Sequence, residues 1–200
     1  MKIQNKIFYF VSLLLLTSCL TIEEDLQINK DGSGKAKIAI KFSDLKENID
    51  KISPEQSDFN FTLLKAKNDS LQHIKGVSNV SMNSNTQFLE FSLKFDFASI
   101  QSLNLAMQAI WDMEEDYIKQ KGKKITVSPF ETVQIKNKVI NSQHAEEILE
   151  NTHYELKITA ESISGVKSEL SPVTTDTTLA IKKNLNDLIP SKLSTNFKFF

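Results

Sequence analysis

The sequence contains no arginine, although it has 24 cationic residues among its 200. Every one of them is a lysine, and they are interspersed with 25 aspartates and glutamates. Arginine is the side chain that most often recognises phosphates and base edges through paired hydrogen bonds. Without arginine, and without a basic cluster, the sequence lacks the features of a nucleic-acid site. We therefore expect no nucleic acid among the partners of this protein.

Cysteine is almost as scarce, because Cys19 is the only one. Exported proteins use cysteines in pairs, as disulfides, so a single cysteine needs another explanation. Cys19 follows the apolar stretch of residues 7–16, which is preceded by Lys2 and Lys6. About ten apolar residues are too few for a membrane-spanning helix, which needs about 20, and are typical of a secretory signal peptide.

The segment Leu16-Thr17-Ser18-Cys19 resembles the lipobox of bacterial lipoproteins. The resemblance implies that residues 1–18 are a lipoprotein signal peptide, that the Cys19 thiol is acylated, and that Cys19 becomes the mature N-terminus. Each buried acyl CH₂ contributes about 0.8 kcal/mol, so several chains hold a protein firmly at a membrane. The alternative is an ordinary signal peptide, or a buried start, with a chance cysteine. No later apolar run reaches about 20 residues, so no spanning helix is expected.

Sequence motifs that carry chemistry are missing as well. The sequence has no GxSxG elbow, no Walker loop and no HExxH zinc motif. His144, Glu147, Glu150 and His153 have the spacing of a loose metal patch, but an exposed charged helix explains them better. We therefore predict no catalytic, cofactor-binding or metal-binding residues, and no cofactor.

Alternating apolar residues are what the sequence does contain. Residues 22–28 and 36–42 each keep their apolar side chains on one parity, and the segment between them is rich in turn residues. We predict a β-hairpin here, with Asp31-Gly32 in the turn and Gly34 at a bulge. Residues 77–97 predict a second hairpin.

The acidic run Glu23-Glu24-Asp25 lies in the first predicted strand. Neighbouring strand residues point to opposite faces, so Glu23 and Glu24 cannot act together as a catalytic pair. We interpret the run as charge at a strand edge, or as an acidic export signal close to the cysteine.

Two longer helices are expected. Ser53 and Pro54 are suited to the start of the first helix, which continues to about residue 66. The second spans roughly residues 99–119 and has an apolar stripe made of Ile100, Leu103, Met107, Ile110 and Trp111. At this spacing Met107 and Trp111 are interpreted as core residues. We expect the stripe to pack on the odd-numbered face of Leu89–Phe97, because a helix that closely follows a strand is its nearest cover.

The C-terminal part shows shorter patterns. Strands are predicted near 125–127, 133–135, 154–160 and 179–181, and a short helix near 141–151. The expected organisation is a repeated ββα unit over 19–121, followed by a strand-rich part over 122–200 that belongs to the same domain or forms its own. The fold class predicted is α+β, with antiparallel β-hairpins and helices packed on one face, preceded by the signal peptide.

Several segments together resemble LppM-like bacterial lipoproteins. They are the alternating strand after the lipobox, the hairpin "I-x-x-D-G-S-G-x-A-x-x-x-I" at 28–40, the Phe-rich strand ending in "FDF", and "YELKITAESIS" and "TTLAIKKNLNDL" at 154–164 and 177–188. The resemblance implies an α+β lipoprotein domain at the cell envelope. It supplies no active-site residues.

These observations predict a lipoprotein anchored at the bacterial cell envelope through N-terminal acyl chains, facing outside the cytoplasm. We expect a non-enzymatic binding or structural module whose partner is an amphipathic ligand or a protein. The alternative is an envelope hydrolase with an unrecognised site. A concave, mostly apolar pocket between sheet and helix would favour a ligand. A flat, exposed apolar patch would favour a protein partner.

Overall fold

The computed structural model describes residues 20–42, 67–85, 90–111, 113–122, 124–127, 152–168, 170–184 and 195–198. Cys19 and the predicted signal peptide lie outside these residues. So do the helices expected at 53–66 and 141–151 and the strand expected at 133–135.

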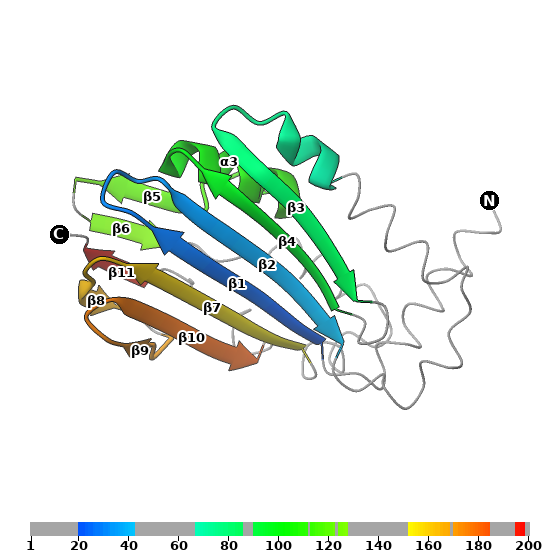
Figure 1. The fold of residues 1–200 in the computed structure, drawn as a ribbon. Helices are drawn as coiled ribbons and strands as arrows, with labels where there is room; N and C mark the ends of the chain where they lie inside the picture. Colours follow the sequence, from blue (N-terminus) through cyan, green and yellow to red (C-terminus); the bar gives the residue numbers. More distant parts are fainter. Residues whose placement is uncertain are drawn as a thin grey trace.

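A seven-stranded sheet forms most of the described fold (Figure 1). Its strands, in spatial order, are β3 (Val77–Asn85), β4 (Glu90–Phe97), β2 (Gly34–Phe42), β1 (Leu20–Ile28), β7 (Thr152–Ala160), β10 (Thr178–Asn184) and β9 (Val173–Thr174). Both predicted hairpins are confirmed, because β1 pairs with β2 and β3 with β4 in antiparallel register.

The turn of the first hairpin depends on two glycines in different ways. Gly32 has a φ of 82°, a conformation that residues with a β-carbon rarely adopt. Gly34 is not at a bulge, as the sequence had suggested, because it pairs in regular register with Ile28. A Cβ at Gly34 would instead overlap the carbonyl oxygen of Gln27 and lie 2.6 Å from Phe97 Cζ. Gly34 is therefore needed for close packing.

The sheet is mixed, which corrects the expectation of antiparallel hairpins alone. β1 and β7 run parallel, with Leu20 opposite Thr152 and Ile28 opposite Ala160. An alternating pattern shows that one face is buried but does not reveal which strand lies beside it, or in which direction. The interpretation of the acidic run as edge charge is also wrong, because β1 lies inside the sheet between β2 and β7.

A second sheet of four strands faces part of the first. It comprises β5 (Ile118–Lys121), β6 (Lys124–Val127), β11 (Thr195–Lys198) and β8 (Ser164–Lys167), in that order. The described structure is consequently dominated by strands. The α+β class holds only in its coarser sense, as sheet with some helix.

Helix α3 spans Ile100–Trp111 and ends about eight residues earlier than predicted. A contact made by the segment after α3 is incompatible with a helix that continues to residue 119. The buried side chain of Asn104 accepts the Ile118 N–H and donates to the Ile118 carbonyl, both at 2.8 Å. This pair of hydrogen bonds holds Ile118 at the start of β5, so the helix cannot continue through it.

The core lies between the seven-stranded sheet, α3 and the second sheet. We call the sheet face that carries the even-numbered residues of β1 the inner face, and the other the open face. The predicted packing is confirmed for the described residues. Phe91, Leu93, Phe95 and Phe97 are buried on the inner face together with Leu103 and Met107 of α3, and Ile100, Ile110 and Trp111 pack against them.

Candidate functional site

An apolar cavity of about 130 Å³ lies between the inner face and the last turn of α3. Its described lining consists of Ile38, Ile40, Lys67, Met82, Phe91, Ser92, Leu93, Ile110 and Trp111. The wall is almost wholly hydrocarbon, and an apolar cavity of similar size, about 150 Å³, is known to stay dry and to take up benzene or xenon. The cavity can therefore hold a small apolar group.

The sheet supplies one wall through cross-strand neighbours. Ile40 lies opposite Phe91, and Leu93 lies between Ile38 and Met82, so two adjacent rows of side chains form the floor. Helix α3 supplies the roof, because Ile110 and Trp111 both lie in its last turn. The Lys67 ammonium donates to the Ala109 carbonyl at 2.6 Å, which joins the helical segment at residues 67–72 to α3.

A buried carboxylate lies on the other side of Trp111. Glu24 is 1 % exposed on the inner face and accepts three hydrogen bonds. Trp111 Nε1 donates to Oε1 at 2.8 Å, Tyr117 donates to Oε2 at 2.5 Å, and the Tyr154 hydroxyl also donates to Oε2. We call Glu24 and these three donors the carboxylate cluster. It ties β1, β7, α3 and the segment before β5 together.

Burial governs the electrostatics of the cluster. Loss of water raises the pKa of Glu24 above its ordinary value of 4.5, and the bonds from Tyr117, Tyr154 and Trp111 oppose this rise only in part. Burial, reinforced by the nearby Glu24 charge, raises the pKa values of Tyr117 and Tyr154 well above 10.0. Both tyrosines therefore stay protonated and keep donating to Glu24 at neutral pH.

Trp111 connects the two features. One part of its indole lines the cavity, while Nε1 is fixed on Glu24. A group that enters the cavity would touch a ring whose orientation the buried carboxylate holds in place. The arrangement is thus suited to a preformed binding surface, because the wall does not have to be ordered at the moment of binding.

Most of the residues that the sequence singled out as candidate sites lie outside the described part of the chain. Cys19 lies outside the described residues, as do His144, Glu147 and Glu150; His153 lies on the open face of β7. Among the described residues no group of His, Cys, Asp or Glu side chains could hold a metal ion. In the same part of the chain, no helix has the length and apolar character needed to cross a membrane.

Sequence reasoning missed the carboxylate cluster, although part of its signal was present. Glu24 has the same parity as Ile22 and Leu26, so the alternation already placed it on the buried face. Its partners Trp111, Tyr117 and Tyr154 are 87 or more residues away, and nothing local identifies them. Met107 is fully buried, as expected, whereas Trp111 is only partly buried and lines the cavity.

Comparison with known proteins supports the fold. No family model and no curated protein matches the chain. Among solved structures, the NMR structure of the folded domain of Mycobacterium tuberculosis LppM is similar, with a TM-score of 0.51 and 10 % sequence identity. The fold resembles that of LppM. The match covers 92 % of this chain and 91 % of the LppM domain, so the predicted resemblance to LppM is confirmed at the level of the fold.

Proposed function

We propose that this protein is a lipid-anchored lipoprotein of the bacterial cell envelope, acylated at Cys19, that acts as a non-enzymatic binding module. The observation that carries the proposal is the apolar cavity under α3, in a fold that resembles a lipoprotein domain. The lipobox-like segment before Cys19 supports the anchor.

The cavity favours a ligand over a protein partner. A protein-docking surface would need a contiguous exposed apolar patch. Among the described residues, the large exposed hydrophobic side chains are Leu105, at 44 %, and Val173, at 73 %, and they belong to α3 and β9 respectively. These isolated residues do not make a patch, whereas the cavity is concave and walled by side chains from three strands and a helix.

The ligand proposed is amphipathic, with a small apolar group in the cavity. A volume of about 130 Å³ is below the 300–1,000 Å³ typical of drug-sized sites, so only part of such a ligand can be enclosed. The remainder would lie outside, where the polar side chain of Lys67 borders the cavity.

The anchor is tested by changing Cys19→Ser in the full chain and measuring its mass. We expect an unprocessed precursor that lacks the acyl mass. Normal processing with an intact metabolic lipid label in this variant would exclude acylation at Cys19.

The cavity is tested with xenon as a small apolar probe, followed by ¹²⁹Xe NMR on the chain from residue 20 onward. We expect saturable binding that Ile110→Phe abolishes, because the larger ring fills the space. Leu105→Phe is the matched control, since Leu105 lies on the exposed side of the same helix. Equal xenon binding by both variants would rule out the cavity as a site. Lipid and protein mass spectrometry of the purified anchored protein would then identify the natural ligand.

A further inference from the structure

The first strand begins directly after the proposed anchor. Leu20, the residue after Cys19, is already paired with Phe42 of β2 and with Thr152 of β7. If Cys19 carries the acyl chains, as proposed above, the sheet has no flexible spacer from the membrane. One end of β1 must then lie at the level of the lipid headgroups, because no linker separates the sheet from the anchor.

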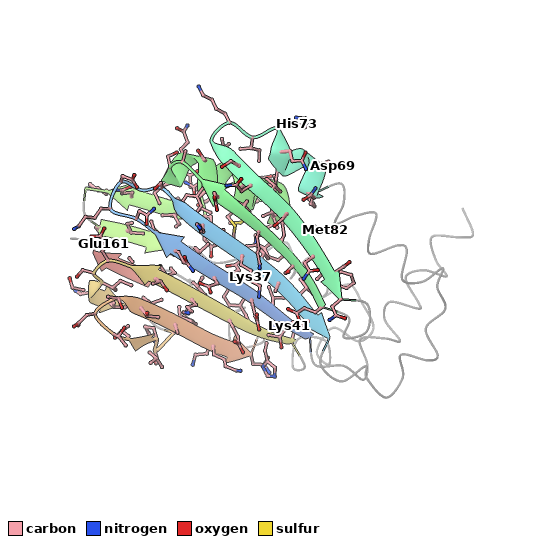
Figure 2. The ribbon with its side chains drawn as sticks, viewed as in Figure 1. Lys37, Lys41, Asp69, His73, Met82 and Glu161 are labelled. Carbon is pink, nitrogen blue, oxygen red and sulfur yellow. The ribbon has the colours of Figure 1, made fainter. Side chains whose placement is uncertain are left out.

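The open face carries a group of lysines that we call the lysine band: Lys35, Lys37, Lys94 and Lys157. The register aligns three of them across the sheet, because Lys37 lies opposite Lys94 on one side and opposite Asp25 on the other, and Asp25 lies opposite Lys157. Figure 2 shows Lys37 on this face, together with Lys41. None of the four forms an ion pair within the described part of the chain.

Two other lysines on the open face are paired with carboxylates. Lys41 pairs with Glu23, and Lys182 with Glu155, each at 2.5 Å. Asp96 accepts a hydrogen bond from Asn79 at 2.7 Å. The lysine band therefore faces two carboxylates, Asp25 and Asp96, with four cations, so the surplus charge within the band is positive. Glu90 is also on the open face, but it lies opposite Lys41 and outside the band.

The same region is hollowed. A shallow groove of about 490 Å³ is lined by Lys35, Lys37 and Lys94, with Asn79 and Ser81 at the β3 side and Asp25 and Asp96 within it. Ammonium groups and an amide around a groove of this kind suit phosphate oxygens, which accept hydrogen bonds from both. The groove is not apolar, so it suits headgroups and not acyl chains.

We propose that the open face of the seven-stranded sheet lies on the membrane, with the lysine band against the phosphates of acidic lipid headgroups. The anchor at Cys19 brings this face to the bilayer, and the lysines then hold it flat. Lysines near an anionic surface each contribute favourably, and the contribution falls off within a Debye length. The inner face, α3 and the cavity would be turned away from the lipid.

Depth labels in the full acylated chain test this orientation. Cys19 is the only cysteine and is blocked by acylation, so an introduced cysteine is the single free thiol. Asn83 and Ser78 are exposed on the open face of β3. Across the sheet, Asn83 is aligned with Glu23 of β1, and Ser78 is aligned with Gln27. Glu23 and Gln27 are roughly 13 Å apart along β1 at about 3.3 Å per residue. Leu105 on α3 is the control away from this face.

Each position is labelled with a fluorophore in vesicles of phosphatidylethanolamine and phosphatidylglycerol that carry a headgroup-attached quencher. We expect similar strong quenching at Asn83 and Ser78 and little at Leu105. Strong quenching at Asn83 together with weak quenching at Ser78, as weak as at Leu105, would overturn the proposal. It would mean that the sheet stands upright on its anchor. Equal quenching at all three positions would mean free tumbling, and would overturn it as well.

Charge removal tests the role of the lysine band. Lys37→Gln with Lys94→Gln should lower the ratio of docked to undocked orientations, measured at Ser78, by roughly tenfold or more. Lys121→Gln with Lys124→Gln changes the same charge on the second sheet and should leave the ratio unchanged. Equal effects of the two pairs would refute the band as the contact. The acyl mass on Cys19 is measured on the same samples, so a missing anchor is distinguished from a wrong orientation.

Discussion

Glu23 and Glu24 are neighbours on β1 and the same residue type, yet they have opposite environments. Glu23 lies on the open face, where it is partly exposed and pairs with Lys41 at 2.5 Å. Glu24 lies on the inner face, 1 % exposed, where two tyrosines and a tryptophan donate to it. The face of the sheet, and not the residue type, therefore decides whether a glutamate forms an exposed ion pair or is buried among hydrogen-bond donors.

The same energetic difference between the two faces should apply to the whole sheet. A surface ion pair contributes about 0–1 kcal/mol, because water screens it and two flexible side chains must be ordered. A buried carboxylate has lost its water, so its hydrogen-bond partners become indispensable. Substitutions on the inner face should therefore cost much more than matched substitutions on the open face.

The largest contrast is expected between Phe95→Ala and Lys94→Ala. Phe95 is 1 % exposed on the inner face, and its removal should cost about 3–5 kcal/mol out of a total stability of about 5–15 kcal/mol. Lys94 points to the open face and should be tolerated. Urea denaturation of the chain from residue 20 onward, followed by circular dichroism, measures both.

Phe91→Ala and Ser92→Ala refine this test. Phe91 already borders the cavity, so its removal enlarges an existing space and should still destabilise the protein. Ser92→Ala should be tolerated. Similar urea midpoints for Phe95→Ala and Lys94→Ala would contradict the assignment of the two faces.

The next contrast lies within the carboxylate cluster. Glu24→Ala leaves two buried tyrosine hydroxyls and the Trp111 N–H without their acceptor, and we expect a loss of about 2–4 kcal/mol. Glu23→Ala removes a partly exposed ion pair and should cost less than about 1 kcal/mol. The same urea titration applies, and Trp111 emission should shift to longer wavelength only in the Glu24 variant. An equal cost for the two variants would show that the cluster contributes no more stability than the exposed ion pair.

Sequence alone predicted the parts of this fold that depend on local alternation. The β1–β2 and β3–β4 hairpins follow from period-two patterns and from the turn residues around Gly32. The packing of α3 on the inner face follows from its nearness to β4 along the chain. These features depend on residues that are close together in the sequence, so they can be recognised from the sequence alone.

Features that join distant segments could not be predicted. The parallel pairing of β1 with β7 brings together residues 132 positions apart, such as Leu20 and Thr152. The position of Ile118 at the start of β5 depends on its bonds with Asn104, and the carboxylate cluster depends on four separate segments. The strand pairing has no local signal in the sequence. The two hydrogen-bonded contacts are each visible locally only as one polar residue, Asn104 or Glu24, among apolar neighbours.

The contribution of Glu24 to stability should depend on pH. Because the folded protein raises the pKa of Glu24, the native state holds this proton more tightly than the unfolded chain does. Its contribution to stability is complete below about pH 4.5 and is lost as the pH rises through the folded pKa. The free energy of unfolding should fall there by at most about 1.4 kcal/mol per pH unit.

Glu24→Gln tests this assignment, since glutamine has nearly the same shape and does not titrate. Subtracting its stability curve from that of the unmodified protein should leave the Glu24 contribution, declining above pH 4.5. A difference curve for Glu24→Gln that rises with pH would mean that the buried carboxylate prefers its charged form.

The smallest contrast is expected at the turn that joins β1 to β2. Gly32 has a φ of 82°, and a Cβ there would lie 3.6 Å from Ile100 Cγ1, which is ordinary contact. Gly32→Val should therefore cost about 1 kcal/mol or more, through backbone strain and not through a clash of the first added atom. Ser33 bonds to Asn29 and Asp31, but these contacts are exposed, so Ser33→Ala should do little. Thermal unfolding measures both variants, and equal melting temperatures would show that the turn relaxes around the added side chain.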